Sequence, residues 1–459
     1  MNARRSFDAM SLLGRLVITA MLTHWTSIAD AQSTCSSTPI ATLYPQGATP
    51  DDGVGHSVAM NAVGDRMFIG APWRNYTSPE YGAVWVISNP GALYQSEVQL
   101  LPATGLSHAW FGADIASNAR GDVLVAGASG SNPASTWPKA YVFRFDGTNW
   151  TEEWHVTSLI DLLGFRVAIS DIGDVIALAA PFREANTSTP NVGAVDIYRC
   201  VVGVWTYEAT LKPANSGIYD YFGGTLTMSG DGKTVAARSM AWTNGTVYVF
   251  EDAGAGSWIE TATLNEAVAH STGGYGSGLA LDFTGTTLAV GSYGDGRMGY
   301  HTGAVLMYRK GSAGWTFEDE MLLPAPALTA QLGWRVAINA AGDRVFAGAH
   351  AYPAAPGVEG GVFEYARDAN GWQTTALHLP PISLLQSGFG HSLTCNATGS
   401  RWAAGEPWSD LYGVDSGVVD LFESSCQTPE IYCTAKTNRL GCLPQIGWQG
   451  TPSASSSSG

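Results

Sequence analysis

The stretch GHSVAMNAVGDRMFIGAP, residues 55–72, places two short apolar runs on either side of a polar turn. Asparagine, glycine and aspartate in such a turn supply the backbone conformations that a tight β-hairpin needs. Similar stretches return as LGFRVAISDIGDVIALAAP at residues 163–181 and as LGWRVAINAAGDRVFAGAH at residues 332–350. A hairpin that returns along a chain indicates a repeat architecture.

The repeat has seven copies, each opening with an apolar residue followed by glycine, at intervals of 52 to 59 residues. The copies begin at Val54, Phe111, Leu163, Phe222, Tyr275, Leu332 and Phe389. Each copy holds up to four β-type runs. The second run ends in a triplet like Gly-Ala-Pro, the third resembles GAVWVI (residues 82–87), and the fourth begins in five copies with tryptophan. Four strands per unit, repeated seven times, predict an all-β fold, a seven-bladed β-propeller of four-stranded antiparallel blades.

The seventh copy ends near residue 425 without a fourth run. The segment PIATLYP, residues 39–45, precedes the first copy and matches the fourth runs at residues 207–213 and 259–265. We therefore expect the N-terminal strand to complete blade seven, which closes the ring and removes its exposed edges. Cys35 and Cys426 flank the two strands that would meet there, and we expect a Cys35–Cys426 disulfide, the alternative being that each pairs elsewhere.

The other cysteines and the two ends of the chain complete the domain organisation. A Cys433–Cys442 disulfide is expected in the tail, while Cys200 and Cys395 are expected to be small buried apolar residues. Residues 1–31 have the basic start, short apolar run and Ala-Asp-Ala ending of a secretory signal peptide, with the general secretory and twin-arginine routes both open. The expected organisation is a signal peptide (1–31), a propeller (32–426), and a cysteine-containing, serine-rich tail (427–459). The protein is expected to be secreted or on the cell surface, monomeric, and without a transmembrane segment.

The repeated motif F-G-x-x-[VI]-A, followed by the hairpin turn, [VA]-G-A-P and GAV-x-V-[YF], resembles the FG-GAP repeat. That repeat builds the seven-bladed propeller of integrin α-subunits and of many secreted bacterial proteins, and the resemblance covers about residues 40–425. It implies the propeller fold and suggests a role in adhesion. Integrin-type members hold Ca²⁺ in D-x-D-x-D-G-x-x-D loops, but the equivalent turns here carry at most two carboxylates, as in SDIGD (170–174). Because Ca²⁺ takes six to eight oxygen ligands, no metal or other cofactor is expected, with calcium as the open alternative.

The charge balance and the absence of catalytic motifs narrow the function. With 39 Asp and Glu against 23 Lys and Arg, the formal net charge is −16. This argues against nucleic acid as a partner, because binding its phosphates needs a basic surface. The sequence also contains neither a G-x-S-x-G nucleophile motif nor an H-E-x-x-H zinc motif.

Polar residues at the start of the first run in several copies form a candidate site. His56 and His391 hold the same position in copies one and seven, which ring closure makes neighbours. One position further along lie Asp114, Arg166 and Arg335 in copies two, three and six. These five residues are expected at the mouth of the central channel. They either give the mouth a positive character or form an ordinary polar lining, and the two histidines either bind a metal or pack without one.

The long loops between the second and third runs, and those between copies, emerge on one face and carry many aromatic residues. They are Trp73, Tyr76, Tyr81, Trp110, Trp137, Phe182, Trp242, Tyr293, Tyr300, Tyr352, Trp408 and Tyr412. Aromatic side chains suit stacking on sugars or anchoring a protein. The sequence therefore favours a non-catalytic binding or adhesion module for a carbohydrate or protein ligand. An extracellular hydrolase or lyase with a site at the channel mouth, and a structural surface or matrix protein, remain alternatives.

Overall fold

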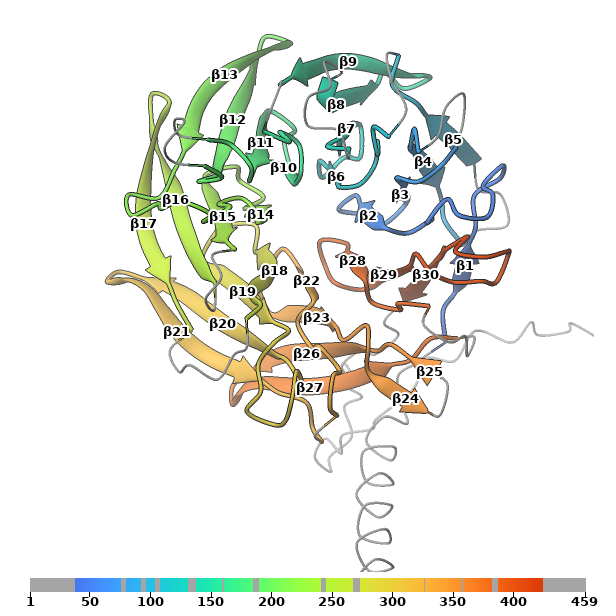
Figure 1. Ribbon diagram of the computed structural model, residues 1–459, viewed down its shortest axis with the longest axis vertical. Coiled ribbons are helices and arrows are strands. Elements are labelled where there is room, and N and C mark those ends of the chain that lie inside the picture. Colours follow the sequence, from blue (N-terminus) through green and yellow to red (C-terminus); the bar gives the residue numbers. More distant parts are fainter. Residues whose placement is uncertain are drawn as a thin grey trace, which may run out of the picture. The chain divides into compact units, whose positions relative to one another are not determined.

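The seven predicted blades stand around a central axis, as the computed structural model shows (Figure 1). It describes residues 38–423 apart from 76–79, 92–95, 104–107, 131–137, 159–160, 185–189, 241–244, 267–272, 326, 356–357 and 382–386. Each blade is a four-stranded antiparallel sheet, so the predicted all-β propeller is confirmed. Among the described residues, no helix has the length and hydrophobicity needed to cross a membrane.

In blades one to six the strands follow one another in chain order from the axis outward (Figure 1). Blades one to three are β2 (Ser57–Met60), β3 (Arg66–Ala71), β4 (Ala83–Ser88) and β5 (Ser96–Leu100); β6 (Ile115–Ser117), β7 (Val123–Gly127), β8 (Pro138–Phe145) and β9 (Trp150–Thr157); and β10 (Val167–Ile169), β11 (Val175–Ala180), β12 (Ala194–Val201) and β13 (Val204–Leu211). Blades four and five are β14 (Thr225–Met228), β15 (Thr234–Ser239), β16 (Thr246–Gly254) and β17 (Ser257–Leu264); and β18 (Tyr275–Leu281), β19 (Thr287–Ser292), β20 (Ala304–Gly311) and β21 (Gly314–Met321). Blade six is β22 (Arg335–Ile338), β23 (Arg344–Gly348), β26 (Val362–Asp368) and β27 (Gly371–His378), with a small inserted pair, β24 (Pro353–Ala355) and β25 (Val358–Glu359).

Blade seven is built from both ends of the propeller. Its first three strands are β28 (Ser392–Cys395), β29 (Arg401–Glu406) and β30 (Val418–Glu423), and its fourth is β1 (Ala41–Leu43). Thr42 lies opposite Asp420 and donates a 2.5 Å hydrogen bond to its carboxylate, while Leu43 lies opposite Val419 in the apolar core. The predicted closure by the N-terminal strand is therefore confirmed.

Several predictions on the chain ends concern residues outside the described part of the structure. The signal peptide, the tail and the expected Cys35–Cys426 and Cys433–Cys442 disulfides all fall there. Cys200 and Cys395, which are described, are free thiols. The sequence predicted buried apolar residues, and the structure places both half-buried against apolar clusters.

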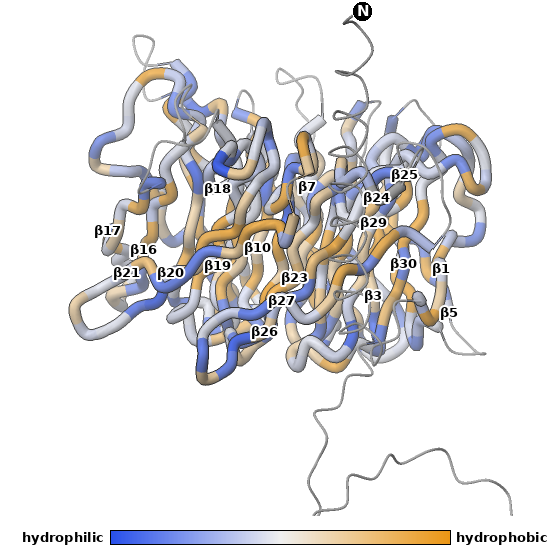
Figure 2. Tube along the Cα trace, turned by 90° about the horizontal axis from the view of Figure 1, so that it is seen from below, coloured by the Kyte–Doolittle hydropathy of each residue, from blue (hydrophilic) through white to orange (hydrophobic). Residues whose placement is uncertain are grey.

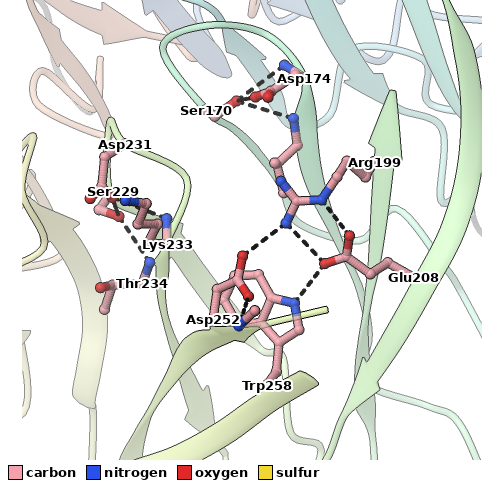
Figure 3. Close-up of polar contacts among 12 residues, drawn as sticks. Ser170, Asp174, Arg199, Glu208, Ser229, Asp231, Lys233, Thr234, Asp252 and Trp258 are labelled. Atoms are coloured by element: carbon pink, nitrogen blue, oxygen red, sulfur yellow. Dashed lines mark hydrogen bonds and ion pairs between the residues drawn. The ribbon is translucent and has the colours of Figure 1, made fainter. Parts of the chain in front are cut away.

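The polar turn of the repeated hairpin is held by a side chain that replaces missing backbone partners. The Asn61 side-chain oxygen accepts 3.0 Å hydrogen bonds from the backbone N–H groups of Gly64 and Arg66. In blade three the Ser170 hydroxyl takes the place of the asparagine side chain and accepts a 3.1 Å hydrogen bond from the Val175 N–H (Figure 3). This local bonding explains why asparagine, serine or aspartate opens each turn.

A circle of seven backbone hydrogen bonds joins these turns at one end of the channel. The N–H groups donate over 2.8–3.1 Å from Ala62 to Ala119, Ala119 to Asp171, Asp171 to Gly230, Asp231 to Phe283, Phe283 to Ala340, Ala340 to Ala397, and Ala397 to Ala62. Each bond links one blade to the next, and the last returns to blade one. The ring is thus closed at the axis as well as by β1 at its rim.

The recurring glycines lie where neighbouring blades approach most closely. Gly82, which precedes β4, has a φ of +85° and forms a bridge to Phe111 of the next blade. A Cβ atom on Gly82 would overlap the backbone of Phe111. Likewise, a Cβ atom on Gly70 would overlap the carbonyl oxygen of Gly112, the opening glycine of blade two. The Phe-Gly and Gly-Ala-Pro elements recur together because they meet across each blade interface.

Fourth-strand tryptophans and ion pairs tie the outer strands of adjacent blades. Trp258 on β17 donates a 2.9 Å hydrogen bond to Glu208 on β13 of the preceding blade (Figure 3). Arg199 on β12 pairs with Glu208 and also reaches Asp252 of the next blade at 3.0 Å. Trp372 and Glu318 repeat the contact between blades five and six.

The apolar core lies between the blades rather than inside any one of them. Each large cluster draws residues from two neighbouring blades, as where Val195 and Phe222 pack together across blades three and four. Apolar residues gather along the strands, and many polar residues lie in the loops on the two faces (Figure 2). Because strands near the axis are covered on both sides, their sequences are apolar on both faces.

Candidate functional site

The first strands of all seven blades surround a central cavity of about 310 Å³. His56, Asp114, Arg166 and Arg335 line it and lie at the end where these strands begin. A smaller cavity of about 140 Å³ lies at the opposite end, among the hairpin turns. We call the first end, with these four residues and His391, the channel mouth.

His56 and His391 are brought together by ring closure. Their ring centroids are 5.2 Å apart, and Nδ1 of His56 lies 3.1 Å from the Ala113 carbonyl oxygen, to which it donates. Burial, with the charges of Arg166 and Arg335, lowers the pKa of His56 to about 4. Burial and the nearby His56 and Arg335 lower the pKa of His391 well below its ordinary value. Both imidazoles are therefore neutral at neutral pH.

A belt of rings extends from these histidines over blades five, six, seven and one. The ring centroids of Trp73 and His56 are 5.2 Å apart, and those of Trp408 and His391 are 4.8 Å apart. Trp334 connects the belt further, with its ring centroid 6.1 Å from that of His391. The ring centroids of His350 and Tyr293 lie 4.6 Å and 5.2 Å from that of Trp334. We call these seven side chains the ring belt. It lies beside the charged residues of the channel mouth.

Two members of the ring belt, Trp334 and His350, were missed by the sequence analysis. Trp334 directly follows the opening glycine of blade six, the position that His56 and His391 hold in their own blades. His350 stands where the repeat has proline in Gly-Ala-Pro. Both departures from the repeat were visible in the sequence, but the proximity of the two rings depends on the blade geometry.

The charged residues at the mouth are only loosely paired. Asp114 accepts a 2.7 Å hydrogen bond from the Val167 N–H, and its carboxylate lies 3.9 Å from Arg166, beyond hydrogen-bonding distance. Burial raises the pKa of Asp114, while Arg166 and the Val167 N–H oppose the shift. Nη1 of Arg335 donates to the carbonyl oxygens of Ser277 and of its neighbour Trp334, both at 3.3 Å. No carboxylate of the described residues forms a hydrogen bond with either guanidinium.

Arg335 remains charged despite its surroundings. Burial and the nearby positive charge of Arg166 lower its pKa to about 9, against the opposing charge of Asp114. The guanidinium is still protonated at neutral pH. With two arginines and one carboxylate, the mouth carries positive charge in a chain whose formal net charge is −16.

The remaining predicted aromatic residues lie apart from the ring belt. Tyr81 is buried and donates a 2.9 Å hydrogen bond to the Pro102 carbonyl, and Tyr352 packs on the core residue Phe363. The structure thus removes Tyr81 from the exposed aromatic surface that the sequence suggested. Trp110 donates to Glu80 at 2.7 Å.

Three further aromatic residues contact nearby rings, and three lie outside the described part of the structure. Phe182 packs between Phe165 and Tyr221, Tyr300 stacks on His301, and Tyr412 stacks on Tyr44. Tyr300 and Tyr412 are 63% and 51% exposed, so they belong to the surface. Tyr76, Trp137 and Trp242 are not described. Within the described ranges, no three His, Cys, Asp or Glu side chains are placed to hold a metal ion.

Comparison with known proteins adds information on the fold. No protein-family model matches the chain, and no curated protein is similar enough to match it. Two crystal structures of Sqt1 from Chaetomium thermophilum are similar to this chain, with TM-scores of 0.51 and 0.52 at 13% sequence identity. The similarity covers 84% and 85% of this chain and 98% and 99% of the Sqt1 chains. At this identity the likeness supports the propeller fold alone.

Proposed function

We propose that this protein is an extracellular, non-catalytic recognition module that binds a carbohydrate or protein ligand at the channel mouth. The observation that carries the proposal is the ring belt, in which Trp73, Trp334 and Trp408 pack against His56 and His391, and His56 lines one end of the cavity. The propeller fold, which serves many functions as a rigid scaffold for loops, is consistent with this role. The FG-GAP resemblance and the signal-peptide pattern support an extracellular location.

The chemistry of the ring belt suits reversible binding. Indole and imidazole rings offer flat apolar faces together with polar edges, which is the combination that stacks on sugar rings or anchors a peptide. The histidines are held neutral, so they contribute hydrogen-bonding groups rather than charge. The rings also pack on one another, edge to face at His56–Trp73 and His391–Trp408 and tilted around Trp334, so little side-chain freedom remains to be lost on binding.

Catalysis at the mouth is less well supported. Glycoside hydrolysis generally uses a pair of carboxylic acids flanking the bond to be cleaved. The described mouth residues include one carboxylate, Asp114, which already accepts a hydrogen bond from the Val167 N–H. The basic and neutral groups that surround it favour binding over acid–base chemistry.

A binding screen tests the proposal. The full chain, after removal of any leader, is applied to arrays of glycans and of extracellular-matrix proteins, beside a Trp334→Ala variant. We expect at least one ligand to be bound by the wild type and to be bound about 10-fold or more weakly by Trp334→Ala. A Tyr207→Ala variant, which removes a 57% exposed aromatic side chain on β13 outside the ring belt, is the control and keeps its affinity. No ligand in either array, or equal loss in both variants, would refute the proposal.

A further inference from the structure

We propose that the channel mouth recognises an acidic sugar, a pyranose carrying a carboxylate or sulfate group, whose anionic oxygens are held by Arg166 and Arg335. This rests on the proposed function and gives its ligand a chemical class. Both arginines line the cavity. Two members of the ring belt, Trp334 and His391, lie close to Arg335.

The first support is that, among the described residues, no carboxylate forms a hydrogen bond with either of these two arginines, in contrast to several other arginines of the fold. Arg74 is fixed to Asp52 at 2.6 Å, and Arg183 bonds both Asp161 and Asp196 at 2.6–2.7 Å. Arg166, by contrast, lies 3.9 Å from its nearest carboxylate, and Arg335 bonds only backbone carbonyls among the described residues. Two partly buried cations therefore face the cavity and share the single carboxylate of Asp114. Such charges are costly unless something neutralises them, and an external anion would do so.

The second support is a set of buried hydrogen-bonding groups without partners at the same place. Trp334 Nε1, Arg166 Nε, His350 Nδ1 and His391 Nδ1 are buried, and no described residue lies within hydrogen-bonding distance of them. The indole and guanidinium N–H groups can only donate, and a neutral imidazole can donate from Nδ1. Buried donors normally have acceptors, so the N–H groups of Trp334 and Arg166 favour a ligand with acceptor oxygens. Carboxylate and sulfate provide several oxygens on one small group.

The sugar component follows from the ring belt and the cavity size. Trp73, Trp334 and Trp408 contact the two histidines of the mouth, and aromatic rings at this place favour a ligand with stackable C–H faces over a free inorganic anion. A volume of about 310 Å³ lies at the low end of the range typical of small-molecule sites, roughly 300–1,000 Å³. It accommodates one acidic unit rather than an extended polymer segment. The opposite end of the channel has no arginine among its described lining residues. Since both arginines lie at the mouth, we place the anionic ligand there.

The test is titration calorimetry of the full chain with three probes: a galacturonic acid trisaccharide, its methyl-esterified counterpart, and a sulfated galactose trisaccharide. Inorganic sulfate alone is a fourth arm. We expect the wild type to bind at least one acidic trisaccharide and to show no binding of the methyl-esterified one. The affinity for the acidic trisaccharide should fall as the salt concentration increases. Arg166→Gln and Arg335→Gln should each weaken binding about 10- to 100-fold. Arg120→Gln is the matched control, since it removes the same charge from an 82% exposed side chain and should leave affinity unchanged.

The outcomes separate this inference from the proposed function. A neutral glycan or a protein that binds with equal affinity to wild type and Arg335→Gln would overturn the acidic-sugar assignment and leave the recognition role standing. Binding of inorganic sulfate as tight as that of the sulfated trisaccharide would overturn the sugar component. Failure to bind any glycan or protein on the arrays would overturn both proposals.

Misfolding is excluded by a second measurement on the same variants. Because the charge of Arg335 is only partly offset by Asp114 in the free protein, Arg335→Gln should unfold at a temperature equal to or above that of the wild type. The acidic trisaccharide should raise the unfolding temperature of the wild type and of Arg120→Gln, but not that of Arg335→Gln. A trisaccharide-induced rise of the same size in Arg335→Gln would contradict the assignment.

Discussion

Gly82 lies so close to Phe111 of the next blade that a Cβ atom at Gly82 would overlap the Phe111 carbonyl oxygen. The two residues form a bridge, and equivalent bridges join Gly193 to Phe222, Gly303 to Leu332 and Gly360 to Phe389. The glycine that opens the third strand is thus part of the joint between blades. Replacing Gly82 by a residue with a Cβ atom should therefore destabilise the ring by more than the cost of the left-handed φ alone.

Gly82→Ala should lower the free energy of unfolding by about 3 kcal/mol or more, because it combines a left-handed φ with a backbone clash. Gly203→Ala is the matched control, since Gly203 has a similar φ of +77° but no atom within 4 Å of the added Cβ. We expect that control to cost about 1–2 kcal/mol. Gly311, with open space and no left-handed φ, should tolerate alanine almost without change. Denaturant unfolding of the three variants measures the order, and equal losses at Gly82 and Gly203 would contradict the interpretation.

Ring closure by β1 should depend on Leu43. This side chain is 4% exposed and packs with Val419 and Leu421 of β30. Leu43→Ala should cost about 2–5 kcal/mol, through lost burial and a cavity at the closure. Ile40→Ala, at a 42% exposed position beside the same strand, should cost about 0.5 kcal/mol. Thermal unfolding compares the two, and a similar effect of both would show that β1 contributes little to closure.

The hydrogen bond between Trp258 and Glu208 can be isolated by comparing two tryptophans at the same repeat position. Trp258 Nε1 donates to Glu208 at 2.9 Å, whereas buried Trp205 Nε1 has no partner among the described residues. Trp258→Phe and Trp205→Phe lose the same ring volume, but only Trp258→Phe also loses a bond to a charged acceptor. We expect Trp258→Phe to be more destabilising by about 1.5 kcal/mol. Chemical denaturation of both variants measures the difference, and the reverse order would disprove the assigned role.

A buried pair of carboxyl groups at the closure should make stability depend on pH. Glu406 and Asp420 are 2% and 0% exposed, and burial raises the pKa of each, with the neighbouring carboxyl raising the pKa of Glu406 further. The folded protein therefore holds a proton that the unfolded chain releases above about pH 4.5. This contribution to stability is complete at lower pH and is lost as the pH rises through the raised pKa of Glu406.

Glu406→Gln keeps a hydrogen-bond donor beside Asp420 but cannot ionise. We expect the variant to lose less stability than the wild type between pH 5 and pH 8, by about 1.4 kcal/mol for each pH unit within the titration window. Urea unfolding at both pH values measures the change. Glu423→Gln, on the exposed end of β30, is the control and should follow the wild type. Parallel pH profiles for wild type and Glu406→Gln would show that the carboxyl pair does not hold the extra proton.

The amino-acid sequence was sufficient to predict the blades and their closure. The alternation of short apolar runs and Asn- or Ser-opened turns is a local property, and the turn bonding at Asn61 and Ser170 confirms it. The match between residues 39–45 and other fourth strands predicted the pairing of β1 with β30. It also predicted that His56 and His391 would become neighbours, because closure of a seven-unit ring requires it.

The environment of the channel mouth, by contrast, was decided by the tertiary structure. The contacts of Trp334 and His350 with each other and with His391, and the absence of a bonded carboxylate at Arg335, depend on side-chain directions across three blades. Tyr81 is buried, with its hydroxyl hydrogen-bonded to the Pro102 carbonyl, and so does not belong to the exposed aromatic face. Nothing in the sequence indicated this contact. Repeat periodicity determines which residues share a position in successive blades, since strand and turn preferences act over a few residues. Distances, burial and pKa shifts arise only when the closed ring brings distant blades together around one axis.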